Sequence, residues 1–175
     1  MSDDPQIDVI EGEPCPFCQQ KALTLRQAER DIPYFGRVLI FSMDCSNCKY
    51  HKADLELVEG SGKPAKYSFD VESEEDLQVR VVKSAAATIK IPRIGSIEPG
   101  ETANGYVTNI EGILNRIKHQ VENFRENTDD DAEKKKAKSL LKKLNRALWG
   151  QDKVKVMLED PTGNSAIISD KTVKK

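Results

Sequence analysis

The sequence predicts a mainly β protein that carries an α-helical hairpin. Three observations lead to this fold class. All four cysteines lie in two Cys-x-x-Cys pairs, the pattern of a zinc ribbon. Several later segments alternate apolar and polar residues, as half-buried strands do. Between residues 108 and 149 the apolar period changes to that of an amphipathic helix, and a polar break divides this stretch in two.

The four cysteines are Cys15, Cys18, Cys45 and Cys48. A Cys-x-x-Cys pair lets two sulfur atoms reach one metal ion from a tight turn, and two such turns complete a tetrahedron of thiolates around Zn²⁺. The segment between the pairs is longer than the roughly 15–20 residues of the commonest arrangement, and it suits a long β-hairpin. The pattern therefore predicts one structural Zn²⁺ with four thiolate ligands.

Other cysteine chemistry fits the pattern less well. Disulfides need an oxidising compartment, and the acidic start MSDDPQIDVIEGEP lacks the apolar region of a secretory signal. A thioredoxin-like pair explains one Cys-x-x-Cys but not two, and iron–sulfur ligation is a further alternative. His51, three residues after Cys48, is an alternative ligand. Four thiolates leave no open position of the kind that a catalytic zinc ion keeps, so a structural site is expected.

The composition fits one compact domain or two small ones. The chain has 175 residues, of which 38% are hydrophobic and 32% charged, with a formal net charge of −2. No stretch approaches the roughly 20 apolar residues of a membrane span, so a cytoplasmic protein without a membrane partner is expected. No Ser/His/acid set, phosphate-binding glycine loop or H-E-x-x-H motif is present. Neither an enzyme nor a small-molecule substrate is therefore expected.

The zinc ribbon is expected over residues 14–59, after an acidic, disordered tail at 1–13. Its strands are expected at residues 22–29, 37–44 and 53–59. A hairpin turn at 31–36, marked by a proline and a glycine, joins the first two strands. Small, turn-forming residues at 60–66 then predict a linker between two domains.

The second domain is expected over residues 67–170, followed by a basic tail at 171–175. Its strands are expected at residues 67–73, 77–84, 87–94, 153–160 and 165–169. Short alternating segments with turn formers between them favour a small sandwich or barrel-like sheet.

A helical hairpin is expected as an insertion into this domain at about 108–149. Apolar residues lie on one face of the first helix, at Ile110, Ile113, Leu114, Ile117, Val121 and Phe124. Thr108, followed three residues later by Glu111, indicates a capping box at its start. The run at 127–131 ends this helix and offers an aspartate cap for the next, which Gly150 ends. Two helices joined by a short polar loop form an antiparallel hairpin.

Two surfaces are candidates for binding a partner. Tyr34 and Phe35, in the ribbon's hairpin turn, are interface anchors if exposed and core residues if they pack against the sheet. The second helix carries many basic residues, among them Lys135, Lys138 and Lys142. They either meet an acidic partner or RNA, or form a solvated helix face. The acidic residues that precede them complement the helix dipole, which favours the solvated face.

Several segments resemble the ZPR-type zinc-finger protein family. CPFC and DIPYFGRVLIFSMDCSNC resemble the zinc ribbon of that family. VRVVKSAAATIKIPRIG, IEPG, GYVTNIEGILNRI and EDPTGNSAIIS resemble its second module, in the same order. The match covers roughly residues 14–169. The family commonly has a glycine after the second cysteine of each pair, where this chain has Gln19 and Lys49.

The resemblance implies a C4 zinc ribbon followed by a double-stranded β-helix domain, which is jelly-roll-like, with the helical hairpin inserted. Eukaryotic members carry two copies of this unit and bind and chaperone translation elongation factor 1-alpha, whereas this chain looks like the single-copy archaeal form. A non-enzymatic, zinc-binding interaction module with elongation factor 1-alpha as its partner is thus expected. The alternative is a zinc-ribbon protein that binds nucleic acid or the translation or transcription machinery. Salt distinguishes the two, because phosphate contacts weaken steeply as ionic strength rises.

Overall fold

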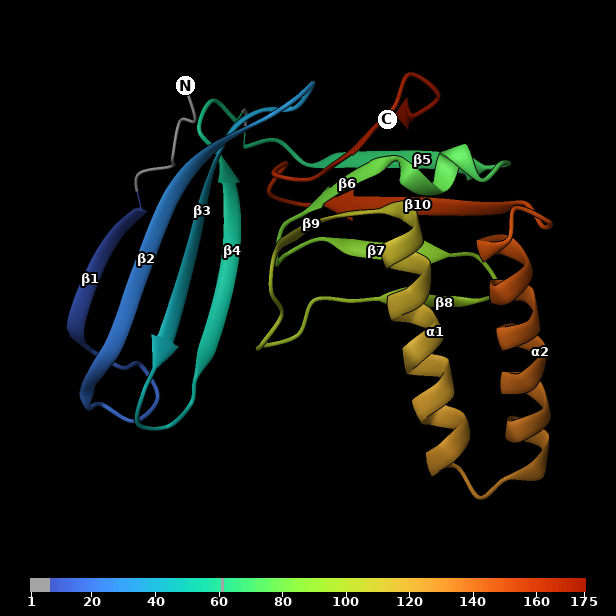
Figure 1. Cartoon of the computed structure of the whole chain (residues 1–175), viewed down its shortest axis with the longest axis horizontal. Coiled ribbons are helices and arrows are strands. Elements are labelled where there is room, and N and C mark those ends of the chain that lie inside the picture. Colours follow the sequence, from blue (N-terminus) through green and yellow to red (C-terminus); the bar gives the residue numbers. More distant parts are fainter. Residues whose placement is uncertain (1–6, 61) are drawn as a thin grey trace.

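The computed structural model describes residues 7–60 and 62–175. Figure 1 shows a four-stranded ribbon beside a second module of two sheets, with two helices projecting from the sheets. The prediction of a mainly β protein with a C4 ribbon and an α-helical hairpin is confirmed.

The ribbon is an antiparallel sheet in the order β1-β2-β3-β4. Its strands are β1 (Ile7–Pro14), β2 (Lys21–Ile32), β3 (Gly36–Cys45) and β4 (His51–Leu57). The long β2–β3 hairpin closes at the predicted turn, where the Phe35 N–H donates to the Ile32 carbonyl over 3.0 Å. Tyr34 and Gly36 both have positive φ there, 65° and 113°, which lets the chain reverse direction within a few residues.

The prediction of a disordered tail at residues 1–13 is wrong for residues 7–13, which belong to β1. This strand pairs with β2 from Ile7 opposite Ala28 to Pro14 opposite Lys21, with an irregularity around Gly12. All eight residues of β1 are exposed. Main-chain pairing with β2, rather than burial of an apolar face, therefore determines this strand, and an apolar periodicity in the sequence could not reveal it. The remainder of the expected tail, residues 1–6, lies outside the described residues.

The second module, called the jelly-roll module below, holds a five-stranded sheet in the order β12-β5-β10-β7-β8 and a three-stranded sheet in the order β11-β6-β9. Its strands are β5 (Ala65–Val71), β6 (Arg80–Lys83), β7 (Thr88–Ile91), β8 (Gly95–Ile97), β9 (Tyr106–Asn109), β10 (Val154–Asp160), β11 (Ala166–Ile168) and β12 (Val173–Lys174). Inward-facing residues of both sheets, such as Phe69, Val81, Ile89 and Leu158, form one core with the helices.

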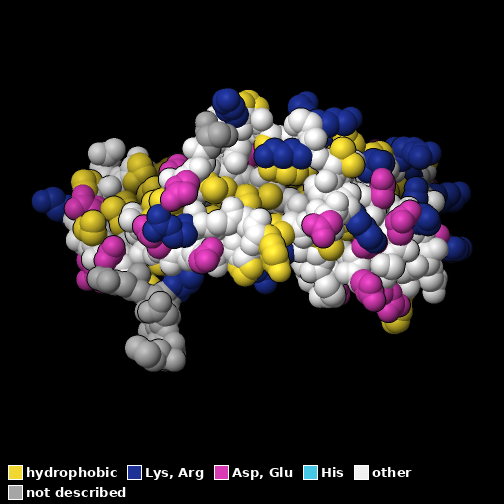
Figure 2. All heavy atoms as spheres, turned by 90° about the horizontal axis from the view of Figure 1, so that it is seen from above, with side chains coloured by type: hydrophobic (Ala, Val, Ile, Leu, Met, Phe, Trp, Pro, Cys, Tyr) yellow, Lys and Arg dark blue, Asp and Glu magenta, His cyan; other side chains and the backbone are white. Residues whose placement is uncertain are grey.

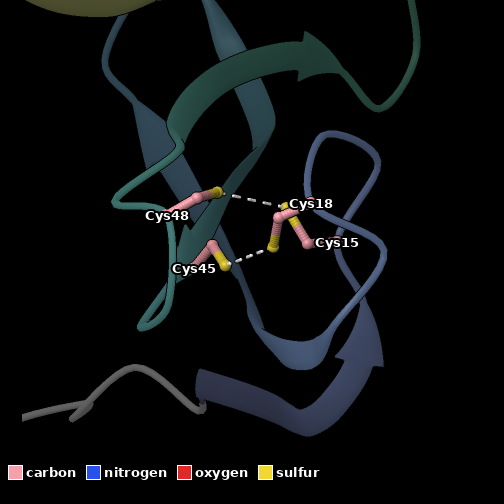
Figure 3. Close-up of side chains that lie close together, drawn as sticks. All are labelled: Cys15, Cys18, Cys45 and Cys48. Atoms are coloured by element: carbon pink, nitrogen blue, oxygen red, sulfur yellow. Dashed lines mark hydrogen bonds between the residues drawn. The ribbon is translucent and has the colours of Figure 1, made fainter.

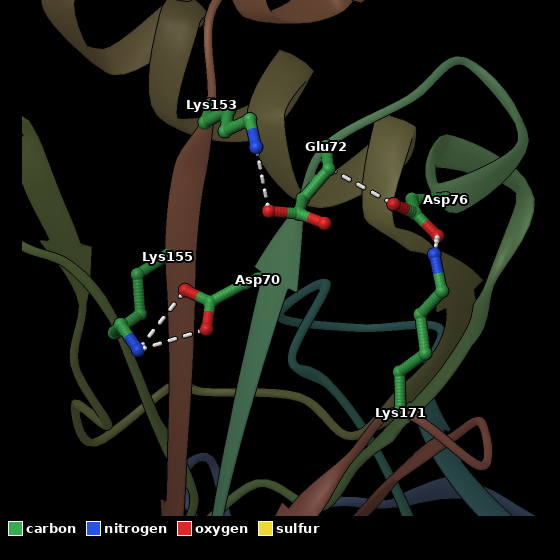
Figure 4. Close-up of polar contacts among 6 residues, drawn as sticks. All are labelled: Asp70, Glu72, Asp76, Lys153, Lys155 and Lys171. Atoms are coloured by element: carbon green, nitrogen blue, oxygen red, sulfur yellow. Dashed lines mark hydrogen bonds and ion pairs between the residues drawn. The ribbon is translucent and has the colours of Figure 1, made fainter.

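Three expectations about this part of the chain are corrected. The strand expected at 77–84 begins only at Arg80, because Glu75–Gln78 form a 3₁₀ turn that buries Leu77. The basic tail expected at 171–175 is part of the fold, since β12 pairs with β5. Figure 4 shows the Lys171 ammonium reaching the buried Asp76 carboxylate, over 2.8 Å. The expected linker also ends early, because β5 begins at Ala65.

The helices α1 (Ile110–Asn127) and α2 (Asp131–Leu148) lie between β9 and β10 in the chain. The cap of α1 is Asn109 rather than the expected Thr108, and its side chain accepts from the Gly112 N–H over 2.8 Å. An aspartate cap was expected from the run at 127–131, and Asp130 is the residue that caps α2. Neither helix is long and apolar enough to cross a bilayer, as far as the described residues go.

Only the first half of α1 is buried in the jelly-roll core. Ile110, Ile113, Leu114 and Ile117 are at most 1% exposed, whereas Phe124, on the same face, is 51% exposed. The far half of the hairpin therefore projects beyond the sheets, as Figure 1 shows. A projecting hairpin with an exposed apolar side chain offers a surface that the protein's own core does not use.

The ribbon packs against the outer face of the three-stranded sheet. Val38 and Leu55 of the ribbon form a small apolar cluster with Val82 of β6 and Ile168 of β11. Because successive residues of a strand face opposite sides, β6 contributes Val81 to the main core and Val82 to this cluster. The three-stranded sheet is thus covered on both faces.

Two asparagine side chains cover the free edge of β4. The Ala53 N–H donates to Asn104 Oδ1 over 2.7 Å, and the Leu57 N–H donates to Asn164 Oδ1 over 3.1 Å. The Gly105 N–H completes the edge by donating to the Ala53 carbonyl over 3.0 Å. These bonds satisfy main-chain groups that an open edge would expose and fix the ribbon on the jelly-roll module.

Candidate metal centre

Two tight turns at one end of the ribbon carry the four cysteines. The turn that holds Cys15 and Cys18 joins β1 to β2, and the turn that holds Cys45 and Cys48 joins β3 to β4. The β2–β3 hairpin folds back on itself, which brings both turns to the same end of the sheet. The long segment between the cysteine pairs is accounted for by this hairpin.

The sulfur atoms have the spacing that a tetrahedral zinc ion requires. A Zn–S distance of about 2.3 Å places the sulfurs of a tetrahedron about 3.8 Å apart. Cys15 Sγ lies 3.7 Å from Cys48 Sγ, and Cys18 Sγ lies 3.7 Å from Cys45 Sγ, as Figure 3 shows. All four sulfurs lie within 4.8 Å of one another. The four cysteines are therefore positioned to bind one metal ion, and the thiolate set fits a structural Zn²⁺.

The two cysteine turns share one backbone geometry. In the first, the Gln19 N–H donates to the Cys15 carbonyl over 2.9 Å; in the second, the Lys49 N–H donates to the Cys45 carbonyl over 3.1 Å. Gln19 and Lys49 both have φ of 62°, in the left-handed region that glycine adopts most readily. These are the two positions at which the resembling family commonly has glycine. Here residues with side chains adopt the same conformation, at a cost of roughly 1–2 kcal/mol each.

The four sulfurs influence one another's ionisation in the absence of a cation. Hydrogen bonds from the Asn47 side chain and the Gln20 backbone lower the pKa of Cys18 to about 6. A backbone bond at Tyr50 favours the Cys48 thiolate, but burial and the neighbouring sulfurs outweigh it and raise the pKa of Cys48 to about 12. A bound Zn²⁺ supplies the positive charge that lets all four sulfurs ionise together, so metal binding releases protons.

The histidines lie outside this set. His51 Nδ1 lies 2.6 Å from the Asp44 carboxylate, and His119 Nδ1 lies 3.2 Å from the Glu122 carboxylate on α1. Cysteine sulfurs alone make up the cluster of four candidate ligands in the described part of the chain. With four protein ligands the tetrahedron is complete, which leaves a bound ion no open position for a substrate.

The two aromatic residues at the ribbon's hairpin turn have different environments. Tyr34 is 98% exposed. Phe35 packs against the cluster formed by Ile32, Val38 and Leu55. The sequence left open whether these residues are exposed or packed, and the structure places Tyr34 on the surface and Phe35 against the ribbon's own cluster.

The three lysines singled out on α2, Lys135, Lys138 and Lys142, are all exposed. None of them forms an ion pair within the described residues. Sequence reasoning missed Trp149, the chain's single tryptophan, which follows α2 and is 71% exposed. An isolated tryptophan at the end of an amphipathic stripe is usually read as a core residue, so no local signal could have identified it as a surface group.

Charge is unevenly distributed over the face of the molecule seen in Figure 2. Figure 2 shows most of the visible lysine and arginine side chains toward the end of the molecule opposite the ribbon, while hydrophobic side chains are exposed over the ribbon and the middle. The ribbon's exposed apolar residues include Ile7, Val9 and Ile10 of β1. Exposed apolar groups of this kind are common at protein–protein interfaces.

Comparison with known proteins identifies both modules. Residues 8–61 match the model of the ZPR1 zinc-finger domain, and residues 75–175 match that of the ZPR1 jelly-roll domain. An uncharacterized ZPR1-like protein of Methanocaldococcus jannaschii is 38% identical over 89% of this chain and 79% of its own length. One from Pyrococcus horikoshii is 38% identical over 95% and 76%. The zinc finger chaperone zpr1 of Schizosaccharomyces pombe is 32% identical over 78% of this chain but only 30% of its own length.

The two family models follow one another along the chain as the ribbon and the jelly-roll module do, and each occurs once. The relatives of similar length are archaeal, whereas the fission-yeast chaperone is much longer than the segment it shares with this chain. The four cysteines at zinc-ligand spacing agree with the zinc-finger model. The chain therefore belongs to the ZPR1 family of zinc-finger proteins, and its 175 residues hold one zinc ribbon followed by one jelly-roll domain.

Proposed function

We propose that this protein is a non-enzymatic, cytoplasmic interaction module that binds translation elongation factor 1-alpha and assists its folding. The observation that carries the proposal is the closed metal centre. All four ligand positions of the ion are supplied by Cys15, Cys18, Cys45 and Cys48, so the zinc acts on the fold rather than on a substrate. A protein relative that is named a chaperone supports a protein as the partner.

The metal centre and the proposed contact surface lie at opposite ends of the ribbon. The cysteine turns close one end of the sheet, and the β2–β3 turn, with Tyr34, closes the other. Zinc stabilises the sheet at the end of which Tyr34 is exposed to solvent. Phe35 holds the turn in place by packing against the ribbon's own apolar cluster. Aromatic side chains that are held on a rigid support are effective interface anchors. The exposed lysines Lys135, Lys138 and Lys142 of α2 are proposed as a second contact.

Binding to the elongation factor tests this function directly. The zinc-loaded protein is mixed with elongation factor 1-alpha of its own organism, and affinity is measured at low and moderate salt. Binding that persists at moderate salt is expected, with at least a tenfold loss for Tyr34→Ala. Val107→Ala, which removes an exposed apolar side chain of β9 in the jelly-roll module, is the control and is expected to bind normally. Absence of binding by the unaltered protein would contradict the proposal.

A second candidate function is nucleic-acid binding, and one observation favours it. A shallow groove of about 370 Å³ on α2 is lined by Trp149 together with Arg125, Lys138, Lys142 and Arg146. An exposed aromatic ring among basic groups is the combination that binds single-stranded nucleic acid, through base stacking and phosphate contacts. Two of these groups are already engaged, since Arg146 pairs with Asp152 and Arg125 with Glu126, so the observation is weaker than the closed metal centre.

The single tryptophan allows a simple measurement for this alternative. Trp149 fluorescence is recorded while a single-stranded RNA is added at increasing salt. Nucleic-acid binding predicts quenching whose affinity falls steeply with salt, by about 0.7 logarithmic units per phosphate contact for each tenfold rise in salt. Unchanged fluorescence at low salt rules this function out for the Trp149 groove.

A further inference from the structure

An apolar groove lies between the helical hairpin and the β7–β8 turn. It has a volume of about 830 Å³. We call it the hairpin groove and define it by the apolar residues Ile94, Ile117, Val121, Phe124 and Leu140 and the basic residues Lys90, Arg93 and Lys136. Figure 1 shows the β7–β8 turn beside the helices, whose far ends extend past it. Among the residues that the structure describes, only the β7–β8 segment, α1 and α2 line the groove.

The apolar side of the groove is partly open to solvent. Ile94 and Ile117 are buried at its base, whereas Phe124 is 51% exposed and Val121 and Leu140 are only partly buried. Ile94 belongs to the β7–β8 turn, and the other four side chains come from both helices; all of them line the groove. Exposed apolar surface of this size, rimmed by polar groups, is typical of a protein interaction site.

The β7–β8 turn is built so that Arg93 lies at the mouth of the groove. The Ile94 N–H donates to the Ile91 carbonyl over 3.0 Å, which closes a turn with Pro92 and Arg93 at its centre. Arg93 has φ of 64°, a conformation that glycine adopts at lower cost. Gly95 then lets the turn approach α1 closely, since a Cβ there would lie 3.2 Å from Ile117 Cγ2.

The charges around the groove point to the chemistry of its occupant. Lys90, Arg93 and Lys136 are exposed, and none of them forms an ion pair within the described residues. One carboxylate, that of Glu133, also lines the groove, and it already accepts from the Thr128 hydroxyl over 2.5 Å. The rim therefore carries an excess of positive charge above an apolar floor. It complements a segment that presents apolar side chains on one side and carboxylates beside them.

We propose that the hairpin groove receives an acidic, apolar segment of the protein partner. This inference rests on the proposed function, because it names the part of the client that this protein would bind. Apolar side chains of the segment pack on Phe124 and Val121, and its carboxylates pair with Arg93, Lys90 and Lys136. The groove is distinct from the Tyr34 surface of the ribbon, so the client is contacted at both ends of the molecule.

Binding variants test the inference. Elongation factor 1-alpha is titrated at moderate salt against the zinc-loaded protein and against Phe124→Ser and Arg93→Glu. Each variant is expected to weaken binding at least tenfold. The matched controls are Val107→Ser, which removes another exposed apolar side chain, and Arg80→Glu, which reverses another exposed charge without an ion pair. Zinc content and thermal unfolding confirm that each variant is folded.

The outcomes separate the two proposals. If the unaltered protein does not bind the factor, the proposed function and the groove inference both fail. If it binds and both groove variants bind equally well, only the groove inference fails. If the unaltered protein self-associates and Phe124→Ser makes it a monomer, the occupant of the groove is a second copy of this chain. That result also overturns the inference.

A photo-crosslinker identifies the segment of the partner that occupies the groove. A benzoyl-phenylalanine placed at position 124 is irradiated in the complex with the factor, and the captured segment is identified by mass spectrometry. A segment with adjacent apolar and acidic residues is expected. The same crosslinker at position 149, outside the groove, is expected to capture a different segment or none. Capture at position 124 of a segment without carboxylates contradicts the inference.

Discussion

The Asp54 carboxylate of the ribbon accepts a hydrogen bond from the Ala85 N–H of the jelly-roll module, over 2.7 Å. Asp54 lies on β4, and Ala85 follows β6, so the bond joins the two modules. The same oxygen accepts from the Leu55 N–H over 2.8 Å. One carboxylate thus connects the edge of the ribbon to the loop that leaves the three-stranded sheet.

Replacing Asp54 with alanine is expected to loosen this junction. Hydrogen bonds to charged groups contribute about 1.5–3 kcal/mol, and their loss leaves the Ala85 N–H without a partner. We expect Asp54→Ala to lower the free energy of unfolding by about that amount and to accelerate hydrogen exchange at Ala85. Asp54→Asn, which keeps a carbonyl oxygen in place, is expected to preserve most of the stability. Equal exchange at Ala85 in the original protein and in Asp54→Ala would contradict the role assigned to the carboxylate.

Gly105 is expected to tolerate no side chain at this junction. A Cβ there would collide with Asp54 Oδ1 and lie 3.1 Å from the Lys83 carbonyl. Overpacking of this kind costs about 1–3 kcal/mol, so Gly105→Ala should lower the urea midpoint. Because Asp54 is the main obstacle, the double variant with Asp54→Ala is expected to lose less stability than the two single losses added together. Strict additivity would show that the collision is relieved elsewhere.

The cysteine turns allow the backbone strain at Gln19 to be tested separately from the general effect of introducing a glycine. Gln19 has φ of 62°, so Gln19→Gly removes strain of roughly 1–2 kcal/mol, partly offset by the greater entropy of glycine in the unfolded chain. We expect a net gain of about 0.5 kcal/mol in zinc-loaded stability. Gln20→Gly, the same substitution one residue later where φ is not positive, is expected to lower stability by about 0.5–1 kcal/mol. Thermal unfolding of both variants checks the pair, and equal effects would contradict the assignment of strain to Gln19.

Acid stability depends on the Asp76–Lys171 pair shown in Figure 4. Burial opposes ionisation of Asp76, but the Lys171 ammonium and the Glu72 N–H outweigh it and hold the pKa of Asp76 below its ordinary value. A depressed carboxyl pKa contributes stability that is fully present above the unfolded pKa of about 4 and is lost as pH falls through the folded pKa. In Lys171→Met the pKa of Asp76 should rise, and the midpoint of acid unfolding should move to higher pH. Lys175→Met is the control and should leave that midpoint unchanged.

The parts of the structure that the sequence predicted are those in which a local pattern and the final packing agree. The two Cys-x-x-Cys pairs predict the metal centre because each turn is local, and the β2–β3 hairpin then brings them together. The helical stripe predicts α1 and α2 because the residues that repeat are the ones that are buried near the core. The run at 127–131 predicts an aspartate cap from its place before the apolar stripe, and Asp130 is the residue that caps α2.

The parts that the sequence did not predict depend on contacts between distant segments. β1 exists because β2 offers it a partner, and its own residues are all exposed. The side-chain amides of Asn104 and Asn164 look like turn residues in the sequence, but they complete the edge of β4 across the module boundary. The hairpin groove likewise combines residues 90–96 with residues 117–140, which no local pattern relates.

Removing one zinc ligand is expected to unfold the ribbon but not the core of the jelly-roll module. The ribbon's own apolar clusters are small, and structural zinc contributes on the order of 10–16 kcal/mol of apparent binding free energy in finger peptides. Cys45→Ser should therefore lose zinc, and residues 14–58 should lose protection from hydrogen exchange. Val82 and Ile168 would then be exposed where the ribbon covered them, whereas Phe69 and Leu158 belong to a separate core.

Metal analysis and site-resolved hydrogen exchange check this prediction, with Ser46→Ala as the control that keeps all four cysteines. We expect the variant to retain slow exchange in β5 and β10, whose side chains lie in the main core, and to exchange faster in β11, whose outer face the ribbon covers. A variant that kept one zinc ion per chain and an unchanged ribbon would show that three thiolates suffice. Complete unfolding of β5 and β10 would instead show that the two modules fold as one cooperative unit, held together by the Asp54 bond and the edge of β4.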